Sequence, residues 1–338
     1  MYWYDETGKE SDVVVSSRIR FARNIADKPF MSRLSEDGAK DIIKQVRDTL
    51  KNNDSWSYTD FEKLPDEEAQ SFVERYDVSP EFIESKLPHG YLRNENTGVG
   101  IMICEEDHIR LQCVRAGLAL EEAFESARQV DDILCEKLDI AFDEKLGFLT
   151  HCPTNLGTAM RASVMVFLPA LSMNHRIGAL STSLGKLGLT IRGMWGEGSD
   201  SDGYMYQISN QTTLGVGEED TIKKLEEITS QIMELERGAR NSMKSDNPER
   251  MTDLAYRSLG TLRSSYLMSS KEFLSLFAYV RLGLSLGILP KDELTHEKLN
   301  EIMVHVMPAT LTLSSGKHLG EIERDKCRAK YLRDILSK

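Results

Sequence analysis

Residues 149–168 place a thiol, a glycine turn and a basic side chain close together in the chain. Cys152 precedes a proline, Gly157 lies in a polar turn, and Arg161 opens an apolar run. Glycine lets the backbone approach a ligand closely, and turn amides can form a nest for an anion. The pattern is compatible with a phosphate or carboxylate site, but from these residues alone it does not favour one. The alternative is a tight turn before a core strand, with Cys152 merely buried.

A second group of basic residues lies on a predicted strand over residues 13–21. With a side-chain period of two, the residues that share one face are Ser16, Arg18 and Arg20. Arg23 is expected in the turn that follows. Two guanidinium groups on one face repel each other unless an anion or a carboxylate lies between them. A solvated edge strand is the alternative.

Residues 98–111 are predicted to form another strand, apolar at first and charged at its end. Alternation places Glu106, His108 and Arg110 on one face. The opposite face takes Glu105, Asp107 and Ile109. Such side chains are costly to bury unless they engage one another or a ligand. A charged strand end in solvent, with a structural His108, is the alternative.

Composition restricts the class of protein. The chain has 338 residues, 40% hydrophobic and 28% charged, which is typical of a globular protein large enough for two domains. A net charge of −12 argues against nucleic-acid binding and favours cationic partners. We expect no membrane span and no secretory signal. Five cysteines without CxxC pairing indicate neither a disulfide framework nor a zinc site, so a cytoplasmic protein is expected.

The elements around these residues suggest two parts. Helices are predicted within 35–90 and over 119–138 and 172–187, and a hairpin is predicted from strands 189–195 and 204–210. Its glycine-rich acidic tip is typical of either a functional lid or a disordered loop.

From residue 220 the apolar period becomes helical, and its first stripe comprises Ile222, Leu225, Ile228, Ile232 and Leu235. Ser269 and Glu272 form a candidate capping box. The interpretation is a mixed domain, 1–243, followed by an all-helical domain, 244–338.

Known nucleotide motifs are missing from the sequence. It contains no GxxxxGK[ST], no GxGxxG and no HRD loop, which disfavours P-loop and ordinary protein-kinase folds. It offers instead the dispersed arginines Arg18, Arg20, Arg110, Arg161 and Arg192. Phosphoryl transfer needs mainly positioning and charge neutralisation, which arginine provides through bidentate contacts.

Three segments resemble, in order and spacing, the signature segments of the phosphagen (guanidino) kinases. They are residues 16–20 (SSRIR), 104–110 (CEEDHIR) and 152–163 (CPTNLGTAMRAS). The resemblance implies an α+β fold: a phosphagen-kinase-like catalytic domain with an antiparallel sheet flanked by helices, here followed by the all-helical C-terminal domain. It also implies MgATP as cofactor and phosphorylation of a guanidinium nitrogen.

The resemblance further implies roles for individual residues. ATP would be bound by Ser16, Arg18, Arg20, His108, Arg110, Arg161 and Arg192. Glu106 and Cys152 would meet the guanidinium, with Glu106 as the base and Cys152 positioning the group. The second acidic residue would be Glu197 in one alignment and Asp200 in the other.

The sequence also departs from the family pattern. Cys104 replaces an asparagine, and Trp195 replaces an arginine that contacts phosphate, a contact that Arg192 would take over. Only fifteen residues precede Ser16, where phosphagen kinases have a helical domain whose loop closes over a small substrate. We therefore expect an open acceptor side that suits a bulky substrate.

Residues 324–329 (RDKCRA) resemble the RDxxRA motif of bacterial protein arginine kinases of the McsB type. The resemblance implies an allosteric phosphoarginine pocket formed by Arg324, Asp325, Arg328 and Ala329, and a C-terminal domain that mediates homodimerisation. From the residues alone, an exposed helix face is the alternative.

The function implied is that of an ATP-dependent protein arginine kinase acting in stress response and marking proteins for Clp proteolysis. Expected partners are protein substrates bearing arginine, a zinc-finger activator protein and a Clp ATPase or protease. One alternative is a kinase for free arginine or another guanidino metabolite. The other is a non-catalytic adaptor that binds phosphoarginine.

Overall fold

The computed structural model of the protein describes residues 2–51, 55–193, 202–290, 292 and 294–336. Its described part contains an eight-stranded sheet in which hydrogen-bonded neighbours run antiparallel. In spatial order the strands are β2 (Trp56–Asp60), β3 (Gly90–Asn94), β4 (Val99–Ile103), β5 (Ile109–Ala116), β1 (Val14–Arg23), β8 (Met160–Phe167), β10 (Met205–Asn210) and β9 (Leu189–Gly193).

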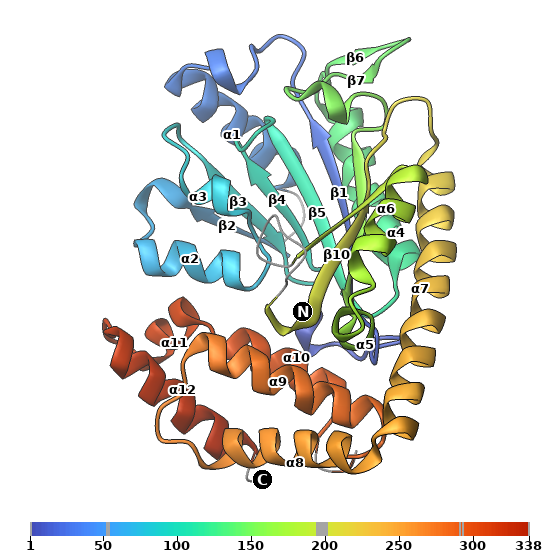
Figure 1. Ribbon diagram of the computed structural model, residues 1–338. Helices are drawn as coiled ribbons and strands as arrows, with labels where there is room; N and C mark the ends of the chain where they lie inside the picture. Colours follow the sequence, from blue (N-terminus) through green and yellow to red (C-terminus); the bar gives the residue numbers. More distant parts are fainter. Residues whose placement is uncertain (1, 52–54, 194–201, 291, 293, 337–338) are drawn as a thin grey trace.

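The main core lies on one face of this sheet. The helices that pack there are α1 (Glu36–Leu50), α4 (Leu120–Lys137) and α7 (Glu218–Asp246) (Figure 1). Inward side chains of β1, such as Ile19 and Phe21, join the apolar side of α4 in one cluster. The smaller elements are α2 (Asp66–Glu74), α3 (Pro80–Ile83), β6 (Phe142–Asp143), β7 (Gly147–Phe148), α5 (Pro169–Met173) and α6 (Ile177–Lys186).

The predicted strand at the beginning of the chain is central, between β5 and β8, so the edge-strand alternative is wrong. Its alternation is confirmed, because Ser16, Arg18 and Arg20 are half-buried while the residues between them are buried. The prediction of Arg23 in a turn is also wrong. Arg23 ends β1, is 1% exposed, and pairs with Asp131 at 2.6 Å.

The prediction of one strand over residues 98–111 is wrong in its second half. Residues 104–108 form a turn that joins β4 to β5, and Cys104 adopts a φ of +66°. The predicted alternation of faces therefore does not apply within this turn. The predicted helix 172–187 is likewise divided into α5 and α6, with His175 at a φ of +55° between them.

The C-terminal part is helical, as predicted. It contains α8 (Pro248–Ser264), α9 (Ser270–Ser285), α10 (His296–His305), α11 (Pro308–Ser315) and α12 (Glu321–Leu336), which gather at one end of the sheet (Figure 1). Their core extends to Trp3 and to Phe167 of the sheet. Ser269 caps α9 by accepting from the Glu272 amide, as predicted. Leu235, placed in the apolar stripe of α7, is instead 54% exposed. No helix of the described residues is long and apolar enough to cross a membrane.

Glu74, at the end of α2, connects the sheet domain to the helical part. Its buried carboxylate accepts from the backbone amides of Ala309 and Thr310 and from the Thr310 hydroxyl, each at 2.8 Å. Glu74 thus caps the N-terminus of α11, whose first amides have no partner within the helix.

Replacing Glu74 with alanine is expected to lower the free energy of unfolding by about 1–3 kcal/mol, because it leaves buried donors unsatisfied. Urea denaturation measures the loss. Glu74→Gln keeps an acceptor oxygen at this position, so it should cost less. Equal stability of the alanine variant and the unmodified protein would contradict the capping role.

Candidate functional site

A cluster of guanidinium groups lies on the sheet face opposite the main core. Arg20 of β1 pairs in register with Arg161 of β8, and Arg18 lies two residues away on the same face of β1. Arg110 of β5 stands opposite Ala22, on the other flank of β1. The antiparallel register therefore brings together four arginines that the sequence separates widely.

Among the residues that the structure describes, the cluster has too few counter-charges. Burial and the neighbouring charges of Arg110 and Arg161 lower the pKa of Arg18 to about 10. Burial and the same neighbours, with Arg18, hold the pKa of Arg20 well below its usual range. Within the described residues, the Nε atoms of Arg20 and Arg161 are buried and lack a hydrogen-bond partner. Guanidinium groups stay protonated, so this face is suited to an anion with several oxygens.

In the described part of the chain, Gln207 and Glu105 form hydrogen bonds with this cluster, and neither was predicted from the sequence as a site residue. Arg18 donates to Oε1 of Gln207, from β10, at 3.1 Å. Arg110 donates to Glu105, whose carboxylate is 3% exposed and also accepts from the Ser79 hydroxyl at 2.6 Å. Burial raises the pKa of Glu105, but the charge of Arg110 and the hydrogen bonds from Arg110, Ser79 and the Glu106 amide together outweigh burial, and the pKa is lowered overall.

Glu106 differs from Glu105 in its surroundings. Its side chain is 39% exposed, and one oxygen lies 3.9 Å from the Arg110 guanidinium. Its amide donates to Glu105 at 2.8 Å, which fixes the backbone of the turn. The turn therefore uses one carboxylate to orient an arginine and presents the other at the border of the cationic cluster.

Cys152 approaches from a different segment. Its Sγ lies 3.0 Å from the Thr154 hydroxyl, and the residue is close enough to Arg161 to influence the pKa of that guanidinium. The thiol and Glu106 are held in relation to each other by Asp107, which is fully buried. Its Oδ1 accepts from the His151 amide and from the Asn24 side chain, both at 2.7 Å. Asp107 thus links the turn to the residue next to Cys152.

Changing Asp107 to alanine is expected to lower kcat by about tenfold or more while leaving the KM for ATP near its original value, because the His151 amide and the Asn24 side chain lose their acceptor and only the acceptor half of the site shifts. It should also alter the pH profile of Cys152 alkylation. Glu74→Ala is the matched control, since Glu74 is also buried and accepts from two backbone amides, those of Ala309 and Thr310 in the helical part. An unchanged alkylation profile would contradict a positioning role for Asp107.

Of the other predicted ATP ligands, two lie near the cluster and one has its polar atoms engaged elsewhere. Ser16 shares the face of Arg18, and the exposed Arg192 is close enough to Arg161 to lower its pKa, after burial and Arg110. His108 points elsewhere. It is fully buried, its Nδ1 accepts from the Ile25 amide at 3.0 Å, and its Nε2 lies 2.9 Å from a backbone carbonyl. Both ring nitrogens are thus engaged in holding the turn. Trp195, Glu197 and Asp200 lie outside the described residues.

The RDxxRA segment lies on α12. Arg328 is 1% exposed and donates to the carbonyls of Val306 and Met268 and to Asp325, so the exposed-face alternative is wrong for it. Ala329 is buried and Arg324 is half-buried. The Arg328 contacts tie α12 to the segments that precede α9 and α11.

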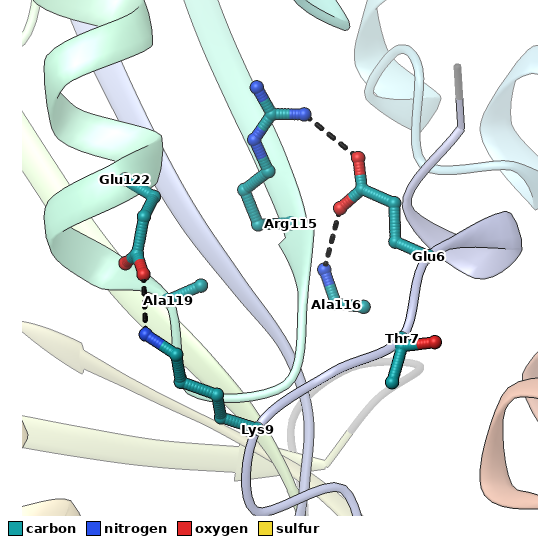
Figure 2. Close-up of a pocket in the computed structure, with 7 residues that line it drawn as sticks. All are labelled: Glu6, Thr7, Lys9, Arg115, Ala116, Ala119 and Glu122. Carbon is teal, nitrogen blue, oxygen red and sulfur yellow. Dashed lines mark hydrogen bonds and ion pairs between the residues drawn. The ribbon is translucent and has the colours of Figure 1, made fainter.

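A separate cavity of about 330 Å³ lies between the N-terminal segment and the start of α4 (Figure 2). Its charged side chains pair with one another, Arg115 with Glu6 at 2.8 Å and Lys9 with Glu122 at 2.7 Å. The charges of this cavity therefore neutralise one another, whereas those of the arginine cluster do not. The arginine cluster is the better candidate for binding an anion.

Comparisons with known proteins identify the family of this chain. A family model described as ATP:guanido phosphotransferase, C-terminal catalytic domain, matches residues 39–239. A second, described as the protein-arginine kinase McsB C-terminal domain, matches residues 248–338. A protein-arginine kinase of Clostridium acetobutylicum is 40% identical over 338 residues and 99% of each chain. Another, from Halothermothrix orenii, is 42% identical over 99% of this chain and 96% of its own.

Solved structures confirm the predicted fold. A lombricine kinase matches with a TM-score of 0.60 at 22% identity, over 70% of this chain and 69% of its own. The duplicated taurocyamine kinase of Schistosoma mansoni matches with a TM-score of 0.62 at 22% identity, over 77% of this chain. This chain spans only 40% of that duplicated protein.

Proposed function

This chain belongs to the ATP:guanido phosphotransferase family, and we propose that it is a protein-arginine kinase that transfers the γ-phosphoryl group of MgATP to arginine side chains of proteins. It is a phosphotransferase with a nitrogenous acceptor. The observation that supports the proposal is the cluster of Arg18, Arg20, Arg110 and Arg161, which is suited to a polyanion and has Glu106 beside Arg110.

In the proposed reaction the arginine cluster holds the phosphates of ATP. Guanidinium forks neutralise the charge of the transferring group and fix it in line with the acceptor. Mg²⁺ would supply further charge neutralisation between phosphate oxygens. No group of three or more acidic, histidine or cysteine side chains in the described residues could hold a metal ion. The ion is therefore proposed to arrive with the nucleotide, as Mg²⁺ commonly does.

The acceptor guanidinium is proposed to lie against Glu106 and Cys152. A free guanidinium is always protonated, so its lone pair is delocalised. Glu106 orients the group and takes the proton as the N–P bond forms, and the γ-phosphorus–oxygen bond to ADP breaks. Cys152 positions the guanidinium. The second acidic contact, from Glu197 or Asp200, stays a prediction.

Mass spectrometry tests the proposal most simply. The protein is incubated with MgATP and an unstructured basic protein, and the products are analysed under conditions that preserve acid-labile phosphate. Phosphoarginine in the substrate is the expected result. Phosphorylation of free arginine alone would favour the metabolite kinase. Binding of phosphoarginine without ATP consumption would favour the adaptor.

The finer features are proposed on family resemblance. They are the homodimer, the allosteric phosphoarginine pocket, the zinc-finger activator, the role in stress response with marking of proteins for Clp proteolysis, and the cytoplasmic location. The matching C-terminal family model supports the assignment of residues 244–338 to this regulatory part.

A further inference from the structure

Apolar side chains are exposed beside the segment that carries Cys152. Phe142 and Leu146, on the β6–β7 hairpin, are 58% and 43% exposed, and Leu214 and Val216, between β10 and α7, are 47% and 37% exposed. We call these four residues the acceptor-side patch. Exposed apolar side chains that gather at loop tips are typical of interaction sites.

Hydrogen bonds join both halves of the patch to the cysteine segment. The Gly157 amide donates to the carbonyl of Leu146 at 2.8 Å, and the Phe148 amide donates back to Gly157 at 2.9 Å. The Thr213 hydroxyl donates to the carbonyls of Thr154 and Leu156 at 3.1 and 2.6 Å. Thr154 is also the neighbour of the Cys152 thiol, so the patch and the thiol form one connected unit.

Gly157 brings the two halves together. Its φ is +100°, and an added Cβ would lie 2.7 Å from the Cα of Leu214 and 2.2 Å from the carbonyl of Thr213. The hairpin contacts the other side of the same glycine. Leu146 and Leu214 therefore flank one backbone position five residues after the thiol.

The surroundings of the patch are acidic. Asp143, Glu144, Glu219 and Asp220 are all exposed, against the single cation Lys145 in segments 142–146 and 214–220. Two copies of this surface would bring like charges together, which disfavours a dimer contact here. A segment that is both apolar and cationic has the complementary chemistry.

We infer that the acceptor-side patch binds the apolar residues that flank the target arginine in an extended substrate segment. This inference rests on the proposed function and names its substrate class. In an extended chain successive residues rise by about 3.3 Å, so neighbours of an arginine that reaches Cys152 lie within a few residues of the patch. Selectivity for apolar flanks then follows from the site itself.

Peptide kinetics tests the inference. Two peptides of equal charge carry one arginine flanked by leucine or by glycine, and kcat/KM is measured for the unmodified enzyme and for Leu146→Ser/Leu214→Ser. We expect the unmodified enzyme to prefer the leucine-flanked peptide by about tenfold, and the variant to reduce this ratio to near one. Activity on the glycine-flanked peptide and the KM for ATP should not change. Leu235→Ser, at a similarly exposed leucine on α7, should preserve the ratio.

Three results would overturn the inference. They are a ratio near one in the unmodified enzyme, an equal loss on both peptides in the variant, and a change of oligomeric state with an unchanged ratio, which would assign the patch to a second copy. Failure of the proposed function looks different, because the unmodified enzyme would then form no phosphoarginine on either peptide.

Discussion

Replacement of Glu106 by glutamine is expected to lower kcat by about 10²–10⁴-fold, the usual contribution of a positioned general base. The amide keeps the size of the side chain but cannot take the guanidinium proton. Glu106 has the exposure that substrate access needs, and it lies 3.9 Å from Arg110 at the border of the proposed phosphate site. Single-turnover kinetics with an arginine-bearing peptide measures the chemical step directly.

Measuring nucleotide binding distinguishes the loss of the general base in Glu106→Gln from a disruption of the whole site. The dissociation constant for MgATP should be unchanged in Glu106→Gln, since the guanidinium groups make the proposed contacts. Glu105→Gln should instead raise the dissociation constant for MgATP, because the buried carboxylate of Glu105 orients Arg110. Substantial turnover by Glu106→Gln would remove Glu106 as the base.

Replacement of Arg20 by methionine is expected to raise the stability of the protein without nucleotide and to abolish its response to triphosphate. Arg20 is a half-buried cation, with a buried Nε, beside three other guanidinium groups, so removing its charge relieves repulsion. In the unmodified protein, inorganic triphosphate at a hundred times its Kd should add about 2.7 kcal/mol to the free energy of unfolding. Thermal unfolding with and without triphosphate measures both effects.

Arg23 provides the matched control on the same strand. It is buried, but it pairs with Asp131 at 2.6 Å and donates to the carbonyls of Ala22 and Thr158. Arg23→Met should therefore destabilise the protein by about 3–5 kcal/mol, because it leaves a buried carboxylate unpaired. If Arg20→Met were equally destabilising, Arg20 would be a structural arginine and not part of a binding site.

Local patterns predicted the parts of this fold that depend on short-range physics. The alternation along β1 placed Arg18 and Arg20 on one face, because the pleat repeats every two residues. Capping at Ser269 followed from the short reach of a hydroxyl. The phosphagen-kinase-like fold came from three motifs in order, and the comparisons confirm it.

Long-range contacts account for the errors. Arg23 resembled a turn residue because its partner, Asp131, lies 108 residues away. The turn at 104–108 interrupts an apparently continuous strand, and its hydrogen-bond partners include Asn24 and His151, which no local pattern identifies. A run of charged residues at the end of an apolar segment is the signal that could have indicated the turn.

Distant partners also explain why the burial of Arg328, in the helical part, was not predicted from the sequence. Arg328 fills its donor positions with carbonyls that precede α9 and α11, and an amphipathic pattern along α12 does not reveal such partners. The roles assigned to the RDxxRA residues stay predictions of the family resemblance.

A crystal structure of the protein with a non-hydrolysable MgATP analogue and an arginine-bearing peptide tests the central claim most directly. We expect phosphate oxygens within hydrogen-bond distance of Arg18, Arg20, Arg110 and Arg161. We expect the peptide guanidinium to contact Glu106 and Cys152. Phosphates bound elsewhere, with these four arginines unengaged, would contradict this claim.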